Sequence, residues 1–128
     1  MKAIILDDDP VIVCLLEKLL VRRGYEVKRY ACPPLCPVYQ NEMCDCSETD
    51  LCADVIITDF EMPFVKGTEF IERMRAKGCK CKHVAMMSGS WTPENLENAI
   101  SMNIKIFHKP FALLPLENWL TEVEKEFR

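Results

Sequence analysis

The order of apolar segments is the feature that most constrains the fold of this chain. Five short apolar runs lack a helical period, and they alternate with segments in which apolar residues recur every three or four positions. The runs predict strands at 2–6, 25–30, 53–58, 82–87 and 104–107. Helices are predicted over about 10–23, 68–77 and 93–102, with a final helix that includes 116–127. Because strands that alternate with helices form parallel βαβ units, we expect an open, doubly wound α/β sheet of five strands.

Several residues mark the ends of these helices. Asp9 and Pro10 are typical of an N-cap and a first helical residue, and Thr68 predicts the N-cap of the second helix. Gly24 and Gly78 follow the last periodic residues, where glycine commonly ends a helix.

Apolar spacing predicts which helix faces are buried. On the first helix Cys14 lies beside the expected apolar face and is interpreted as a small core hydrophobe. That face comprises Ile12, Leu15, Leu16, Leu19 and Leu20. The stripe predicted for the final helix comprises Leu116, Trp119, Leu120, Val123 and Phe127.

Composition narrows the class of protein. With 128 residues, the chain has the length of one ordinary domain, so we expect a single domain over 1–128. A formal net charge of −4 argues against a nucleic-acid-binding surface. No apolar run approaches the roughly 20 residues of a membrane span, and three early aspartates argue against a secretory signal. We therefore expect a cytoplasmic protein without nucleic-acid or membrane partners.

Polar side chains follow four of the predicted strands. Asp7, Asp8 and Asp9 follow the first strand, and Asp59 follows the third. The fourth and fifth strands lead to Ser88 and Lys109. In an open α/β sheet, ligands bind beyond the carboxyl ends of the strands. Clustered carboxylates favour Mg²⁺, beside which a carboxylate can attack phosphorus to form an acyl phosphate stabilised by lysine. The sequence therefore predicts an aspartyl-phosphate site.

These motifs resemble those of a known family. The motifs are Asp7-Asp8, the D-x-x-M-P of 59–63, Ser88-Gly89 and the Lys-Pro-Phe of 109–111. They resemble the receiver domains of two-component response regulators, of the single-domain chemotaxis type. The similarity covers the chain except 31–52, and it implies a flavodoxin-like sheet with strand order 2-1-3-4-5.

The resemblance implies a Mg²⁺ site. Asp8 resembles the principal carboxylate ligand, and Asp7 contributes through water. The ion would also take the carboxylate of Asp59 and the backbone carbonyl of Glu61. Since the side chain of Glu61 would lie near the phosphoryl group, we hypothesise that it sets the lifetime of the acyl phosphate.

The remaining roles concern the phosphoryl group. Asp59 resembles the phosphoacceptor, Ser88 the switch hydroxyl and Lys109 the lysine that contacts the phosphoryl oxygens. An aromatic residue often stands three positions before this lysine, but here Ile106 occupies that place. The neighbouring Phe107 is expected to face the other way and to be a core residue.

The resemblance also implies partners. A phosphohistidine on a sensor histidine kinase or a phosphotransfer protein would be the donor. We expect a stand-alone receiver that contacts an unknown downstream protein. The expected docking surfaces are the helix at 93–102 and the final helix with Leu113, Leu114, Leu116 and Trp119. It would not be an enzyme beyond its own Mg²⁺-dependent phosphorylation and dephosphorylation.

Eight cysteines distinguish this chain. The segment 31–52 holds five of them with three prolines and predicts an irregular insertion in place of a second helix, with one helical turn at 38–43. Four thiolates can hold Zn²⁺ or an iron–sulfur cluster. The candidate ligands are Cys44, Cys46, Cys52, Cys79 and Cys81, with Cys32, Cys36 and His83 in reserve. If the strand order follows the family, the third and fourth strands begin side by side, so we expect Cys52 to lie close to Cys79 and Cys81. Free buried cysteines, or a disulfide formed in vitro, are the alternative.

Two other functions compete with the phosphoacceptor interpretation. A metal- or redox-sensing module could use the cysteines on a receiver scaffold. A small phosphatase could use an Asp-x-Asp nucleophile at Asp7 and Asp9, but it would leave Asp59 and Lys109 unexplained.

Overall fold

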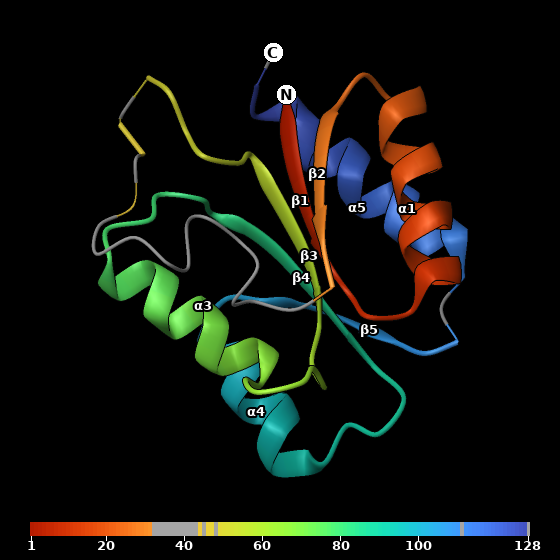
Figure 1. Cartoon of the computed structure of the whole chain (residues 1–128), viewed down its shortest axis with the longest axis vertical. Helices are drawn as coiled ribbons and strands as arrows, with labels where there is room; N and C mark the ends of the chain where they lie inside the picture. The colour runs from red at the N-terminus through yellow and green to blue at the C-terminus, as the bar shows by residue number, and fades with distance from the viewer. Residues whose placement is uncertain (32–43, 45, 48, 111, 128) are drawn as a thin grey trace.

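The computed structural model describes residues 1–31, 44, 46–47, 49–110 and 112–127. Five parallel strands form one sheet in the order β2-β1-β3-β4-β5 (Figure 1), which confirms the predicted flavodoxin-like fold. The strands are β1 (Lys2–Leu6), β2 (Glu26–Tyr30), β3 (Val55–Asp59), β4 (His83–Ser88) and β5 (Lys105–His108). The helices are α1 (Pro10–Arg22), α3 (Gly67–Ala76), α4 (Pro93–Ser101) and α5 (Leu113–Lys125).

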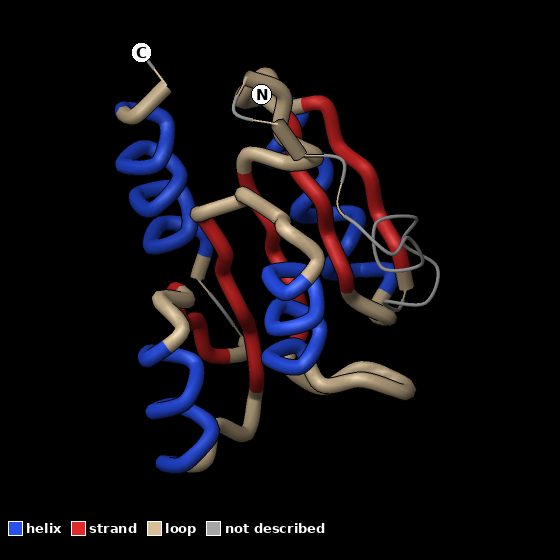
Figure 2. The backbone as a smooth tube through the Cα atoms, turned by 90° about the vertical axis from the view of Figure 1, so that its left-hand side faces the viewer, coloured by secondary structure: helices blue, strands red, loops and turns tan. Residues whose placement is uncertain are grey.

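Helices cover both faces of the sheet. Figure 2 shows the strands in red with blue helices before and behind them. One apolar core lies between the sheet and α1 and α5, and includes Ile5, Leu16, Leu20, Ile57, Leu116 and Leu120. The other lies against α3 and α4, and includes Ile4, Leu6, Ile56, Phe70, Met74 and Ala99. Because alternate residues of each strand enter opposite cores, the central strands are apolar throughout.

Burial of β3 positions the polar residue at its end. All five of its residues are buried, and Thr58 and Asp59 are its polar members. β1 lies on one side of β3 and β4 on the other. Asp59 is therefore held at the carboxyl edge of the sheet between two neighbouring strands.

The residues predicted to mark helix ends were right at Asp9, Gly24 and Gly78 but wrong at the start of α3. Asp9 accepts a hydrogen bond from the backbone N–H of Val11 (3.0 Å), and Gly24 and Gly78 have φ of 92° and 88°. The prediction of Thr68 as an N-cap was wrong. Lys66 is the N-cap without a side-chain hydrogen bond, while Thr68 is buried inside α3.

Four burial predictions were wrong. On α1, Leu15 is 42% exposed and Cys14 is exposed, while Val13 is buried. The buried face of α1 thus consists of Val13, Leu16, Leu19 and Leu20. Leu116 was predicted to contribute to a docking surface, but it is buried in the core beneath α5. Phe127 is 44% exposed because α5 ends at Lys125.

Much of the predicted insertion 31–52 lies outside the described residues. This holds for the helical turn at 38–43 and for Cys32 and Cys36. The described positions from 44 to 52 contain neither helix nor strand. No helix of the described chain is long and apolar enough to cross a membrane.

Candidate functional site

The carboxyl ends of the central strands bring the predicted polar residues together. Lys109, directly after β5, places its Nζ 3.0 Å from Asp7 Oδ2 and 3.3 Å from Asp59 Oδ2. Asp7 follows β1, and its backbone N–H donates to the carbonyl of Tyr30 (3.2 Å). One ammonium group therefore joins carboxylates from two neighbouring strands.

The site carries more negative than positive charge. Asp7, Asp8 and Asp59, here called the acidic cluster, each offer a carboxylate oxygen within 4.8 Å of the others. Asp7 is 2% exposed and Asp59 is 7% exposed. Burial raises the pKa of Asp59, and the charge of Asp7 raises it further, against the opposing effect of Lys109. For Lys109, burial favours the neutral form, but the hydrogen bond to Asp7 and the two carboxylates raise its pKa overall.

These residues fit a hard divalent cation. The acidic cluster holds three carboxylates, and the ammonium group of Lys109 contacts two of them, so the four side chains together keep a negative excess when all are charged. Carboxylate oxygens with room for water are the ligands that Mg²⁺ prefers. The backbone N–H of Glu61 donates to Asp59 Oδ1 (3.4 Å), which brings the Glu61 backbone to the edge of the cluster. Its carbonyl stays a predicted ligand.

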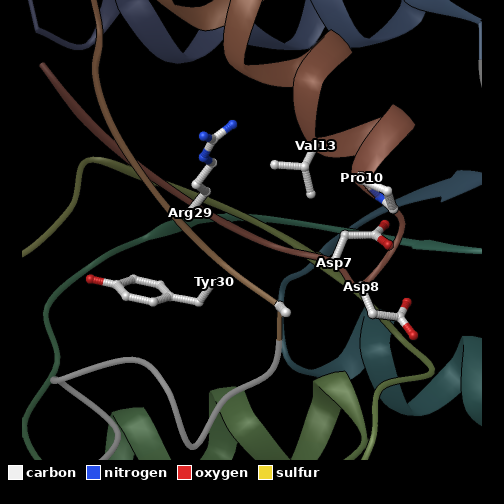
Figure 3. A pocket seen from close by; sticks show the side chains of 7 residues that line it. Asp7, Asp8, Pro10, Val13, Arg29 and Tyr30 are labelled. Carbon is white, nitrogen blue, oxygen red and sulfur yellow. The ribbon is translucent and has the colours of Figure 1, made fainter.

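A cleft reaches Asp7 and Asp8 of the acidic cluster. It has a volume of about 380 Å³ and lies between the end of β1, the start of α1 and the end of β2. Figure 3 shows the side chains of Asp7 and Asp8 at one end of this cleft and Arg29 and Tyr30 along it. The lining residues are Asp7, Asp8, Pro10, Val13, Arg29, Tyr30 and Ala31.

A family model for the response regulator receiver domain matches residues 3–120. The chain belongs to this family. Receiver domains commonly bind Mg²⁺ in such an acidic pocket, and they interact with histidine kinases or phosphotransfer proteins.

Solved structures agree with the family. The chemotaxis protein CheY4 of Vibrio cholerae is 25% identical with a TM-score of 0.75, over 95% of this chain and 97% of that chain. A CheY-like receiver domain protein of Methanospirillum hungatei is 25% identical with a TM-score of 0.70, over 98% and 97% of the two chains. The receiver domain of the Francisella response regulator 1452 shares the fold at 18% identity, with a TM-score of 0.78 over 99% and 98%. No curated protein matched the sequence of this chain.

Ser88, the predicted switch hydroxyl, lies at the end of β4. Ser88 is 2% exposed, and its Oγ accepts a hydrogen bond from the backbone N–H of Ser90 (3.1 Å). Ser90 in turn donates its Oγ–H to Glu61 Oε1. The structure thus links Glu61 to the loop after Ser88, a role for Ser90 that sequence reasoning missed. The sequence feature that could have indicated this role of Ser90 is the small, polar run Ser88-Gly89-Ser90, which begins with the predicted switch residue.

Gly67 is a second supporting residue that was missed. Its backbone N–H donates to the carbonyl of Phe60 (2.8 Å). A Cβ atom at this position would lie 2.6 Å from the carbonyl oxygen of Asp59 and 3.1 Å from Cα of Phe60. The absence of a side chain therefore lets the start of α3 pack directly on the backbone of the predicted phosphoacceptor.

The aromatic residues near β5 follow the predicted alternation. Phe107 is buried in the core beside α5, where its ring meets Trp119 edge-on at a centroid distance of 6.1 Å. Ile106 packs against the opposite core. Trp91 lies on that same side, with its ring 5.0 Å from Phe60 and its Nε1–H donating to the carbonyl of Phe107 (3.0 Å). Trp91 therefore connects the residue after Asp59 with β5.

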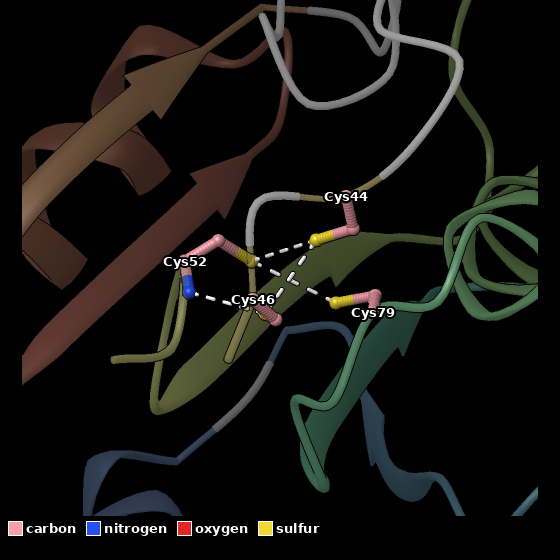
Figure 4. A group of neighbouring side chains, drawn as sticks. All are labelled: Cys44, Cys46, Cys52 and Cys79. Carbon is pink, nitrogen blue, oxygen red and sulfur yellow. Dashed lines mark hydrogen bonds between the residues drawn. The ribbon is translucent and has the colours of Figure 1, made fainter. Parts of the chain in front are cut away.

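Four of the five candidate thiolates converge. Sγ of Cys44 lies 3.5 Å from that of Cys46 and 3.7 Å from that of Cys52, which lies 3.7 Å from that of Cys79 (Figure 4). The predicted proximity of Cys52 and Cys79 is confirmed. Cys81 does not join the group, because its side chain is buried in the core and its Sγ–H donates to the carbonyl of His83 (3.9 Å).

His83, one of the three reserve ligands, also has partners outside the group of cysteines. The imidazole of His83 lies 2.8 Å from the Glu126 carboxylate, and its ring contacts Phe127 at a centroid distance of 5.9 Å. Among the described residues, the sulfurs that lie within 4.8 Å of one another are those of Cys44, Cys46, Cys52 and Cys79, here called the four-cysteine cluster.

Proposed function

We propose that this receiver accepts a phosphoryl group on Asp59 from a phosphohistidine of a histidine kinase or phosphotransfer protein, with Mg²⁺. The observation that carries the proposal is the contact of Lys109 with both Asp7 and Asp59 inside the acidic cluster. A structural ion pair needs one carboxylate for one ammonium group. Three carboxylates around one lysine instead leave a negative excess that a divalent cation and a phosphoryl group together can use.

The transfer would be a nucleophilic displacement at phosphorus. A carboxylate oxygen of Asp59 forms the new P–O bond while the P–N bond to the donor histidine breaks. The imidazole nitrogen keeps the electron pair of the broken bond and then takes a proton. Lys109 neutralises phosphoryl oxygens as its contacts with the carboxylates are exchanged. Mg²⁺ held by Asp8, Asp59, Asp7 through water and the Glu61 carbonyl would supply charge neutralisation.

The switch would follow from the same geometry. Ser88 lies at the end of β4, the strand beside β3, and its hydroxyl can donate to a phosphoryl oxygen on Asp59. That donation favours a different arrangement of the loop through Ser90 and Trp91, so phosphorylation would bias a two-state equilibrium. In this proposal the protein acts as a signalling phosphoacceptor and does not turn over other substrates.

The arrangement weighs against the phosphatase alternative. An Asp-x-Asp nucleophile would need Asp9 to face the same site as Asp7. Instead the Asp9 carboxylate caps α1 through the N–H of Val11, and the backbone N–H of Asp9 donates to Asp7 Oδ1 (2.9 Å). Asp9 is outside the acidic cluster.

Intact mass spectrometry after incubation with acetyl phosphate and Mg²⁺ tests the proposal. We expect one phosphate per chain. No phosphate should be added when a chelator is present before the donor, and none should be added to Asp59→Asn. Asp9→Asn is the matched control, because asparagine caps a helix as well as aspartate does and should leave phosphorylation unchanged. A phosphate adduct that persists in Asp59→Asn would refute the assignment of Asp59.

A further inference from the structure

The four-cysteine cluster lies at the opposite end of β3 from the acidic cluster. Cys52 precedes β3, Cys79 follows α3, and Cys44 and Cys46 come from the segment that leads toward β3. Since β3 has five residues, the two ends are separated by roughly 17 Å. The cysteines therefore form a site of their own, which the phosphoryl chemistry does not use.

Distances within the four-cysteine cluster match a single tetrahedral ion. Around an ion with Zn–S bonds of about 2.3 Å, neighbouring sulfurs lie about 3.8 Å apart. The closest sulfur pairs here are 3.5, 3.7 and 3.7 Å apart, and all four cysteines are free thiols. An iron–sulfur cluster places several iron and sulfide atoms between its thiolates and therefore needs wider spacing.

The backbone offers a hydrogen bond to one of these sulfurs. The N–H of Cys52 donates to Sγ of Cys46 (3.2 Å). An N–H donor of this kind orients and stabilises metal-bound thiolates.

The charges near the cysteines in the sequence are mixed. Four thiolates around a divalent ion carry a net charge of −2. Lys80 and Lys82 are exposed on either side of Cys81, whereas the segment that supplies the other three cysteines contains Asp45, Glu48 and Asp50. Among divalent metals, Zn²⁺ binds such sites more tightly than Fe²⁺ and favours four sulfur ligands in a tetrahedron.

We propose that Cys44, Cys46, Cys52 and Cys79 bind one Zn²⁺ in a closed, structural site. A site with four protein ligands has no open position for catalysis. The ion would join three parts of the receiver that the backbone already brings together. The N–H of Cys44 donates to the carbonyl of Lys77 at the end of α3 (2.8 Å), and Cys52 and Cys79 pack against the core beneath α3.

Metal analysis of protein purified without oxygen and without a chelator tests the proposal. We expect one zinc per chain in the wild type and less than a tenth of that in Cys52→Ser and Cys79→Ser. Cys14→Ser is the control, because Cys14 is an exposed cysteine on α1, and it should keep the full zinc content. Cys81→Ala should also keep it, since Cys81 is outside the four-cysteine cluster.

Two measurements on the wild-type chain test the zinc site without depending on the folding of any variant. Replacement of zinc by Co²⁺ should give the visible absorption of a tetrahedral thiolate site. Alkylation under native conditions should label Cys14 at once, and removal of the metal should expose the four cysteines of the cluster to the reagent. Stoichiometric iron, a disulfide among these four residues, or full reactivity of their thiols in protein grown with zinc would each overturn the proposal.

This outcome is separate from the phosphoacceptor assignment. Phosphorylation of Asp59 without bound zinc would leave the proposed function intact and refute only the metal site. Bound zinc in a chain that acetyl phosphate cannot phosphorylate would support the metal site and refute only the proposed function.

Discussion

The substitution Asp59→Asn removes one charge from the acidic cluster with little change of shape. We expect it to raise the free energy of unfolding of the metal-free receiver at neutral pH. Asp59 is buried, close to Asp7, and shares Lys109 with it. Its carboxylate is thus more costly to the folded chain than to the unfolded chain, in which it is surrounded by water.

The distances set the size of this effect. The contact of 3.3 Å between Lys109 and Asp59 corresponds to about 5 kcal/mol of attraction at an effective dielectric constant of about 20. Carboxylate oxygens of Asp7 and Asp59 within 4.8 Å correspond to about 3.5 kcal/mol of repulsion at the same constant. Burial of the carboxylate adds a cost of about 3 kcal/mol. The repulsion and burial together exceed the attraction, so the variant should be more stable by about 1 to 2 kcal/mol.

The pH dependence gives an independent check on this reasoning. The pKa of Asp59 is raised above its ordinary value of 3.8, chiefly by burial and by the charge of Asp7. The folded state therefore keeps this proton at pH values where the unfolded state has lost it. The contribution of Asp59 to stability is complete below pH 3.8 and is lost as the pH rises through the folded pKa. The difference between Asp59→Asn and wild type should widen with rising pH across that window and then stay constant.

Urea denaturation in the presence of a chelator, from about pH 4.5 to about pH 8, measures the difference. Comparing two chains that differ at one residue cancels the titration of the other groups. Added Mg²⁺ should stabilise the wild type more than the variant, because only the wild type keeps all three carboxylates. A variant that is less stable than the wild type at neutral pH without metal would refute the balance of charges worked out above.

Three further predictions concern residues around Asp59. Gly67→Ala should lower the free energy of unfolding by about 1 to 3 kcal/mol in urea denaturation and slow phosphorylation by acetyl phosphate, because the new Cβ would lie 2.6 Å from the Asp59 carbonyl oxygen. An unchanged free energy of unfolding would contradict this prediction. Glu61→Ala should change the dephosphorylation rate of the acyl phosphate by about threefold or more, since Glu61 is held beside Asp59 by Ser90. An unchanged rate would remove its assigned role. Phosphorylation should change Trp91 fluorescence, because its ring packs on Phe60 and its Nε1 bonds to β5; Trp91→Phe separates this signal from that of Trp119.

The sequence was most informative where one physical pattern determined the structure. Alternation of apolar runs and helical periods predicted all five strands, and the parallel topology explains why Asp7, Asp59 and Lys109 meet at one edge. The pattern was less informative about the rotation of α1. Val13 and Leu15 are both apolar, and only the packing of α1 on the sheet decides that Val13 is buried and Leu15 exposed.

Contacts that depend on backbone positions were the hardest to predict. Thr68 is a good N-cap residue by type, but Gly67 packs closely on Asp59 as the first residue of α3, and the N-cap is Lys66, two residues before Thr68. The cysteines show a similar limit. Neighbouring parallel strands predicted that Cys52 and Cys79 would meet. Cys81 lies in the irregular chain before β4, so no alternation rule fixes its direction, and it enters the core.

The two ends of β3 can influence one another only through the packed elements that join them. At physiological ionic strength the screening length is about 8 Å, so charges roughly 17 Å apart are largely screened unless the path between them is buried. Loss of the proposed zinc should therefore act on Asp59 mechanically. The same two elements carry both sites. Cys52 precedes β3, and Asp59 is its last residue. Gly67 is the first residue of α3, and Cys79 follows its end. An ion at the cysteines would hold one end of this β3–α3 pair together, and the contact of Gly67 with Asp59 holds the other. If both proposals hold, the cysteines would support the position of Asp59 even though they lie too far away to take part in its chemistry.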